Sequence, residues 1–144
     1  MGITTTNLNP NVDGSTLQWT ASPGATHYTG IDEGISAIDS TDYIYSDTFN
    51  QVDEFGFESS PSTMGVATGI QVRANMKLVD EDEVCAVKVD YSLDGGSSYT
   101  NAGYIIPTTY GTRATDTVSI TSLWEGKSAI NNLQIKLTFV SETT

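Results

Sequence analysis

Residues 70–78 read IQVRANMKL, and every even-numbered position in this stretch is apolar while every odd-numbered position is polar. Residues 85–93, CAVKVDYSL, repeat the pattern with the larger apolar side chains at odd positions. A period of two is typical of a β-strand with one face buried and the other in water. The acidic turn between the stretches, Asp80 to Glu83, belongs in solvent, so we expect the two strands to pair antiparallel. Half-covered antiparallel sheets build β-sandwiches, and the chain is therefore expected to be all-β.

The rest of the chain supplies further short strands at roughly ten-residue spacing. Apolar residues alternate or cluster between turn signals at 16–20, 27–31, 42–49, 52–57, 99–106, 115–120 and 133–140. In the segment 115–120, Val118 and Ile120 are expected to face inward. This pattern predicts an antiparallel β-sandwich, jelly-roll-like in its strand spacing, with almost no helix. A closed β-barrel is the alternative.

The N-terminal residues differ from this pattern. Residues 1–14, MGITTTNLNPNVDG, lack periodicity and contain Pro10, so we expect an extended N-terminal arm. Residues 15–144 then form a single β-sandwich domain, since a chain of 144 residues can bury one adequate core. With no run of 18 apolar residues and no hydrophobic leader, neither a membrane span nor a secretion signal is expected.

Charge is distributed unevenly along the chain. The formal net charge is −12, and residues 1–72 carry nine acids without a lysine or arginine, while residues 73–144 carry nine acids and all six bases. Nucleic acid and anionic membrane are poor partners for such a surface, and a basic protein surface is a better one. Solubility alone is an ordinary second reason for an acidic surface.

No group of residues in the sequence assembles a catalytic, cofactor or metal site. His27 is the only histidine and Cys85 the only cysteine, and Cys85 is expected to point into the core. Carboxylate pairs suited to glycoside hydrolysis can be drawn from many of the 18 acids, so such pairs carry no specificity. The run Asp80 to Glu83 lacks the alternating spacing that directs side chains at one Ca²⁺ ion. We therefore expect a protein that is not an enzyme and binds no cofactor.

One eight-residue segment carries a recognisable turn motif. Residues 92–99, SLDGGSSY, resemble the Asp-box that recurs in sialidases and many other β proteins. Its chemistry is local, because an aspartate can accept N–H bonds within the turn and glycines allow positive φ. The motif therefore predicts a β-hairpin turn and not sugar hydrolysis. The residues expected to shape the turn are Ser92, Asp94, Gly95, Gly96 and Tyr99.

Two longer segments point to a family. One comprises Trp19-Thr20, His27-Tyr28, residues 31–33, residues 42–44 and residues 47–49. The other comprises residues 123–126 (LWEG), residues 130–132 (INN) and the terminal strand. Together these segments resemble small structural proteins of tailed-bacteriophage virions, of the head decoration (cement) or tail accessory type.

The resemblance implies a non-enzymatic structural protein on the phage capsid surface, made in the host cytoplasm. Its partners are expected to be the major capsid protein or copies of itself, forming a homo-oligomer on the particle without nucleic acid or membrane. The arm residues Ile3, Leu8 and Pro10 are expected to dock on a neighbouring subunit, in one version by adding a strand to an exposed sheet edge.

Three alternatives come from other classes. A carbohydrate-binding jelly roll would use aromatic rings, drawn from Trp19, Trp124 and the tyrosines, to stack on sugars, although Trp19 alternates in phase with Leu17 and is expected in the core. A tail-fibre or baseplate component of a phage would form a trimer continuing into a shaft. A hydrolase would need a cleft that joins His27 to activated acids.

Overall fold

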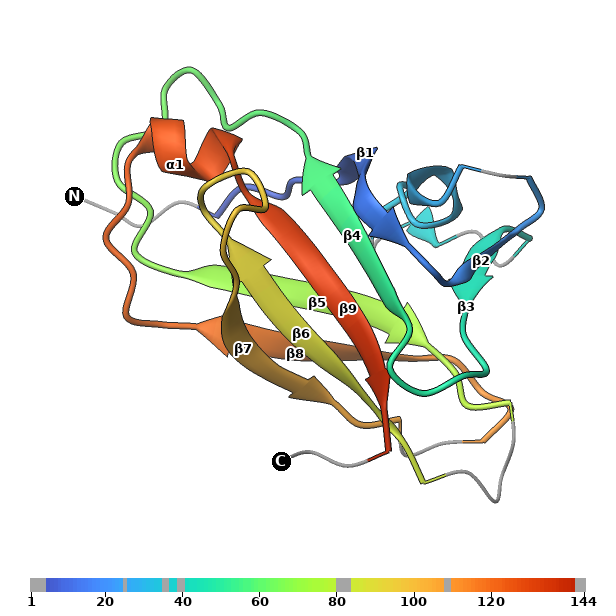
Figure 1. Ribbon diagram of the computed structural model, residues 1–144. Coiled ribbons are helices and arrows are strands. Elements are labelled where there is room, and N and C mark those ends of the chain that lie inside the picture. Colours follow the sequence, from blue (N-terminus) through green and yellow to red (C-terminus); the bar gives the residue numbers. More distant parts are fainter. Residues whose placement is uncertain are drawn as a thin grey trace.

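The protein is an all-β sandwich built from antiparallel sheets, as the alternating sequence patterns predict. The computed structural model describes residues 5–24, 26–34, 37–38, 41–79, 84–107 and 110–141. The front layer in Figure 1 is a five-stranded sheet in the order β1-β4-β9-β6-β7, here called the main sheet. Its strands are β1 (Pro10–Leu17), β4 (Val52–Phe57), β6 (Ala86–Ser92), β7 (Thr100–Ile105) and β9 (Gln134–Val140).

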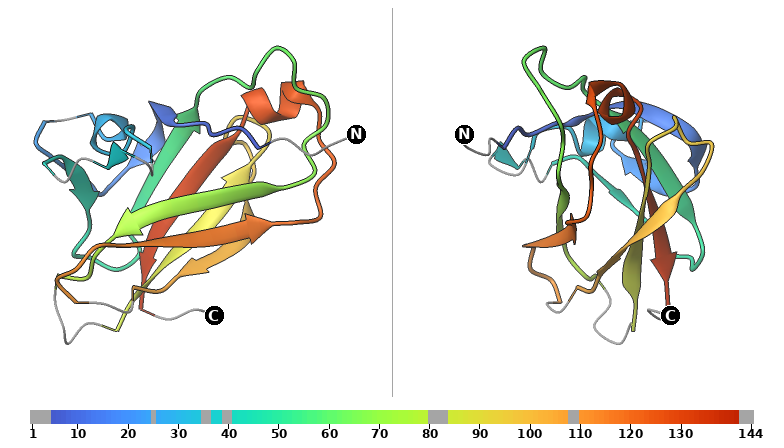
Figure 2. Two further views of the ribbon diagram at one scale, coloured as in Figure 1. Left: turned by 180° about the vertical axis from the view of Figure 1, so that it is seen from behind. Right: turned by 90° about the vertical axis from the view of Figure 1, so that its left-hand side faces the viewer.

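The second layer is a two-stranded sheet of β5 (Ile70–Met76) and β8 (Ala114–Ile120), paired antiparallel over seven residues. Figures 1 and 2 show these strands crossing behind the main sheet at a steep angle. The expected pairing of the strands at 70–78 and 85–93 is therefore wrong, because β5 pairs with β8 while β6 pairs with β7 and β9. The connection between them passes from one layer to the other, and its acidic turn lies outside the described residues.

The core lies between the two layers. Its buried members come from β6, β7, β8 and β9 and from the residue preceding β9, namely Val87, Val89, Ile105, Val118, Leu133 and Ile135. The even-numbered apolar residues of β5 pack against this cluster and are half-buried. Because the core face of β6 holds Val87 and Val89 while β5 contributes Ile70 and Val72, the predicted alternation gives the correct inward faces.

A small lobe beside β1 follows the first strand. It contains β2 (Thr20–Ser22) paired with β3 (Tyr43–Tyr45), and the 3₁₀ helix η1 (Tyr28–Gly30). The expected strand at 27–31 is wrong, since His27 and its neighbours turn into η1, where the Asp13 carboxylate accepts hydrogen bonds from the N–H groups of His27 and Tyr28. The short helix α1 (Lys127–Asn131) lies at one end of the sandwich, where Asn131 Oδ1 accepts hydrogen bonds from the N–H and hydroxyl of Ser60.

The N-terminal segment is more ordered than its composition indicates. Residues 10–14, expected in a separate arm, are the first part of β1 and pair with β4. Just before β1, Asn9 and Glu58 exchange hydrogen bonds, with Asn9 N–H donating to the Glu58 side chain and Glu58 N–H to the Asn9 carbonyl. The register between β1 and β4 shifts at two points. These irregularities remove the period-two pattern by which a strand is recognised in a sequence.

Candidate functional site

The hairpin joining β6 and β7 is held by a compact set of hydrogen bonds around Asp94. The Asp94 carboxylate accepts hydrogen bonds from the Ser92 hydroxyl (2.6 Å), the Ser98 N–H (2.9 Å) and the Ser98 hydroxyl (2.6 Å). These donors lower the pKa of Asp94 to about 2. Gly95 and Gly96 have φ values of 71° and 93°, a region that glycine adopts without steric cost.

The loop then folds onto the outer face of the main sheet. The Tyr99 hydroxyl donates to the Gln134 side chain, and the Gln134 amide donates to the Gly95 carbonyl. The Lys136 Nζ lies 4.3 Å from the centre of the Tyr99 ring. Burial raises the pKa of Tyr99 to about 12, and the nearby Glu54 carboxylate adds to the shift. The loop therefore closes part of a face that an alternating strand would leave in water.

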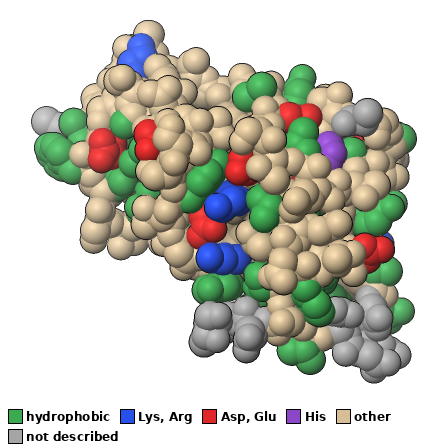
Figure 3. All heavy atoms as spheres, viewed as in Figure 1, with side chains coloured by type: hydrophobic (Ala, Val, Ile, Leu, Met, Phe, Trp, Pro, Cys, Tyr) green, Lys and Arg blue, Asp and Glu red, His purple; other side chains and the backbone are tan. Residues whose placement is uncertain are grey.

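Beneath the loop, three charged side chains and one amide form a row that we call the polar rung: Glu54, Lys136, Asp90 and Asn101, aligned across four strands. Glu54 accepts from the Ser15 hydroxyl, Asp90 accepts from the Asn101 amide, and Lys88 Nζ lies 3.9 Å from Asp90. Figure 3 shows acidic and basic side chains side by side in the middle of this face. The sequence pattern places Asp90 and Ser92 in water, and this is wrong, because both side chains are buried.

A second buried polar pair lies on the opposite face of β4. His27 Nδ1 and Asp53 Oδ2 are 2.5 Å apart, and Asp53 Oδ1 accepts the backbone N–H of Trp19. Burial raises the pKa of Asp53, while the hydrogen bond from His27 opposes the rise. The pair connects η1 and the segment before β2 to the main sheet. Sequence reasoning missed it, although Asp53 lies in phase with Phe55 and Phe57 and so predicts a carboxylate that needs a partner.

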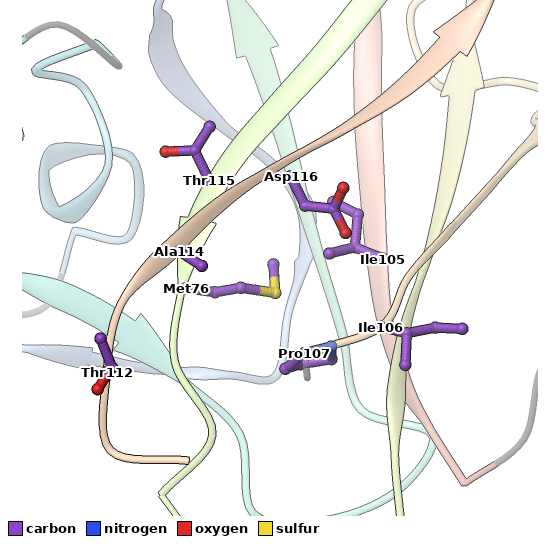
Figure 4. A pocket seen from close by; sticks show the side chains of 8 residues that line it. All are labelled: Met76, Ile105, Ile106, Pro107, Thr112, Ala114, Thr115 and Asp116. Atoms are coloured by element: carbon purple, nitrogen blue, oxygen red, sulfur yellow. The ribbon is translucent and has the colours of Figure 1, made fainter. Parts of the chain in front are cut away.

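The two layers diverge at the end where β5 and β7 stop and β6 and β8 start. A hollow of about 240 Å³ lies there, lined by Met76, Ile105, Ile106, Pro107, Thr112, Ala114, Thr115 and Asp116. Figure 4 shows these side chains. Large apolar side chains are exposed around this end, which we call the apolar end: Val79 (74%), Val84 (80%), Ile106 (50%) and Tyr110 (54%). Single exposed apolar residues are ordinary, but a group of them beside a hollow is typical of a docking surface.

The sequence-predicted partner-binding residues do not gather at this end. Leu8 and Pro10 are half-buried beside β4 on the far edge of the main sheet, and Ile3 lies outside the described residues. Cys85 is half-buried rather than buried, directly before β6. Trp19 is also half-buried, with its indole N–H donating to the Gln51 carbonyl, and it packs against the core.

Other aromatic side chains are exposed. Trp124 is 76% exposed, and the rings of Tyr43 and Tyr45 lie side by side on β3 with centroids 6.2 Å apart. Both tyrosines are exposed, so this pair offers a small aromatic surface on the lobe. No sequence pattern distinguishes these tyrosines from the core ones, since β3 has only three residues.

Acidic side chains of the lobe lie close together. Burial raises the pKa of Glu33, and the neighbouring carboxyls of Asp42 and Asp32 raise it further. Asp42 Oδ1 is buried and has no hydrogen-bond partner among the described residues. Within that part of the chain, no group of three or more histidine, cysteine or acidic residues has a geometry that could hold a metal ion.

Comparison with known proteins adds no relative. The chain matches no protein-family model, no curated protein and no solved structure. Neither helix in the described ranges has the length and apolar character needed to cross a lipid bilayer. The functional argument therefore depends on the surfaces described above.

Proposed function

We propose that the protein is a non-enzymatic structural component of a phage particle, with the capsid surface as its place and head decoration as its role. The observation that carries the proposal is the apolar end, where four large apolar side chains stand in solvent beside a hollow. Covering such a surface on a partner removes apolar area from water at roughly 25 cal/mol per Å². This argues for a protein whose work is adhesion, and the sequence resemblance supplies the virion as the setting.

The acidic surface supports the same kind of partner. A net charge of −12 favours a basic protein surface over nucleic acid or anionic lipid. The apolar end and the lobe are different surfaces of the molecule, so that one subunit can contact two neighbours on a lattice. Bridging of this kind is how a decoration protein stabilises a capsid.

The test is the location of the chain on particles purified from the phage that encodes it. Immunogold labelling confined to heads, with the chain present by mass spectrometry, is the expected result. Labelling confined to tails would replace the head role by the tail-fibre or baseplate alternative. Absence of the chain from purified particles would contradict both.

Two variants separate the docking surfaces. Ile106→Asp places a charge at the apolar end and should reduce occupancy on particles at least about tenfold, because the buried contact would hold an unpaired charge. Ser128→Asp adds the same charge at an exposed position of α1, at the opposite end of the sandwich, and should leave occupancy unchanged. Equal occupancy for both variants would show that the apolar end does not dock.

The arm is tested by a truncation that respects the fold. Deleting residues 1–7 leaves Asn9, β1 and the Asp13 bonds to η1 in place, whereas deleting residues 1–14 removes most of an edge strand. Loss of particle binding in the shorter deletion, with the circular dichroism spectrum unchanged, would support docking by the segment that contains Ile3. Undiminished occupancy would contradict docking by that segment.

A second candidate function is carbohydrate binding, favoured by the exposed ring pair of Tyr43 and Tyr45 and by Trp124. Aromatic faces complement the C–H surfaces of sugars. Titration against a glycan panel tests it, and the Tyr43→Ala/Tyr45→Ala variant should then lose affinity. If no glycan shifts the tryptophan fluorescence or the thermal midpoint, this candidate is removed.

A further inference from the structure

The outward face of β5–β8 is cationic in an otherwise acidic protein. The side chains of β5 that alternate with the core residues are Gln71, Arg73 and Asn75, and their partners on β8 are Ser119, Thr117 and Thr115. Lys77 follows β5, and Arg113, which precedes β8, donates a hydrogen bond to Asn75 on this face. We call Arg73, Lys77 and Arg113 the basic face; they are half of the six bases in the chain.

Within the described part of the chain, these cations form no salt bridge with a carboxylate. Among the described residues, the salt bridges are those of His27 with Asp53 and Lys88 with Asp90, and none involves the basic face. The one acid of β5 and β8, Asp116, is in register with Ala74 and points to the inner side, where it lines the hollow. Figure 2 (left) shows the protein from behind, where β5 and β8 lie in front and no helix or strand covers them.

The complementary surface lies in the first half of the same chain. Asp32, Glu33 and Asp42 crowd together in the lobe, in a half of the chain that has no lysine or arginine. Asp42 Oδ1 is buried and has no hydrogen-bond partner in the described structure. An incoming guanidinium or ammonium group would relieve the repulsion between these neighbouring carboxylates.

From this complementarity we propose that the basic face of one copy binds the acidic lobe of a second copy, head to tail. The contact joins different surfaces of the two subunits, so it repeats and gives a ring or a row instead of a closed two-fold dimer. This self-association rests on the proposed assembly function, and the partner that it names is a second copy of the chain. Its failure is distinguishable, because particle labelling can persist when self-association is lost.

Salt should control the contact in a characteristic way. At about 0.15 M ionic strength the Debye length is about 8 Å, which screens the repulsion between two acidic subunits but not ion pairs in contact. At 1 M salt it falls to about 3 Å and the ion pairs weaken as well. Sedimentation velocity should therefore show concentration-dependent association in the moderate buffer and monomers at 1 M.

Charge variants test the two surfaces separately. Arg73→Glu should weaken association at least about tenfold, since a like charge would meet the acidic lobe. Lys127→Glu makes the same change in net charge on α1 and is the matched control, expected to associate as the wild type does. Glu33→Lys alone should also weaken association, because a positive charge in the lobe would then meet the basic face of the second copy. All three positions are exposed or half-buried, and unchanged circular dichroism spectra establish that the variants fold.

Mixing distinguishes a head-to-tail contact from any other. Arg73→Glu keeps an intact lobe and Glu33→Lys keeps an intact basic face, so an equimolar mixture should associate although each variant alone does not. A wild type that stays monomeric at millimolar concentration would overturn the proposal. So would association that survives Arg73→Glu, or a loss in Lys127→Glu as large as in Arg73→Glu.

Discussion

His27 and Asp53 show how much a single buried pair does in this molecule. Asp53 is fully buried and its two carboxylate oxygens serve two segments, the Trp19 backbone and the His27 ring. A buried acceptor with both oxygens occupied fixes the lobe against β4. The pair is a structural connection, and its loss should lower the free energy of unfolding.

His27→Ala should lower the free energy of unfolding by about 3 kcal/mol, because it leaves the Asp53 carboxylate buried without its partner. Urea denaturation followed by circular dichroism measures the change. The control is Thr29→Ala, an exposed position on the same 3₁₀ helix, expected to change stability by less than about 0.5 kcal/mol. Equal effects at the two positions would mean that the pair carries no stability.

The lowered pKa of Asp94 predicts that the hairpin loses stability in acid. Its pKa of about 2 in the folded protein lies below the ordinary value of 3.8, so its ionised form stabilises the fold above about pH 4. This contribution should disappear as the pH falls from about 4 to 2. Urea midpoints of the wild type and Asp94→Asn should therefore differ at pH 7 and converge near pH 2. A gap independent of pH would assign the effect of the substitution to shape alone.

The raised pKa of Tyr99 predicts a loss of stability at high pH. Its pKa of about 12 in the folded state means that the protonated form is favoured, and stability should fall as the pH rises from about 10 to 12. Glu54→Gln removes one cause of the shift and should lower the pKa of Tyr99, measured by absorbance at 295 nm. Glu58→Gln, an exposed acid beyond the same strand, is the control that should leave the titration unchanged.

Among the elements, β1 depends on the closeness of its approach to β4. A Cβ atom at Gly14 would lie 2.6 Å from Glu54 Cβ and 2.9 Å from the Glu54 carbonyl carbon and oxygen. Only glycine therefore allows the two strands to keep this spacing. The same contact brings Ser15 within reach of Glu54 and joins β1 to the polar rung.

Gly14→Ala should cost about 1–3 kcal/mol, because β1 must move away from β4 or the Glu54 backbone must shift. Gly65→Ala is the matched control, since no atom lies within 4 Å of the position that its Cβ would occupy. That control should be neutral or slightly stabilising. Thermal melts of the two variants give the comparison, and an unaffected Gly14→Ala protein would contradict the tight approach.

The strands show which part of the fold a sequence determines. Period-two patterns correctly predict the inward faces of β5, β6, β8 and β9, because side-chain direction is a local property. They do not determine neighbours, so the pairing of β5 with β6 is wrong, since the segment from Lys77 to Cys85 is long enough to change layers. β1 escapes detection because its register shifts and its Gly14 interrupt the pattern.

The candidate site also divides into local features, which the sequence predicts, and features that depend on the order of the strands. The turn at residues 92–99 can be anticipated, because the hydrogen bonds around Asp94 join residues at most four apart. The polar rung cannot, because Glu54, Asp90 and Lys136 meet only through the order of the strands. The apolar end likewise depends on four chain segments that converge after folding.

At the scale of the whole molecule, stability is distributed unevenly. No residue of β2 or β3 is buried, whereas β6 has five buried residues. A two-stranded ribbon of three residues per strand has little stability of its own. The lobe is therefore held mainly by its contacts with β1 and by the His27–Asp53 pair.

Hydrogen–deuterium exchange should consequently be faster in β2 and β3 than in β6 and β9, since the lobe can open without unfolding the sandwich. His27→Ala should accelerate exchange in the lobe far more than in β6. Mass spectrometry of peptides covering residues 20–24 and 43–49 makes the measurement. Uniform protection of lobe and sandwich would show instead that the molecule opens as one unit.

The central place of β9 has a consequence for how the protein is made. β9 leaves the ribosome after every other described strand, and both β4 and β6 use it as their neighbour. Until it emerges, the nascent chain can form the pair β1–β4 and the hairpin β6–β7, but their inner edges stay open. A message that breaks before the codons for β9 thus yields two unjoined halves whose open edges are prone to aggregate.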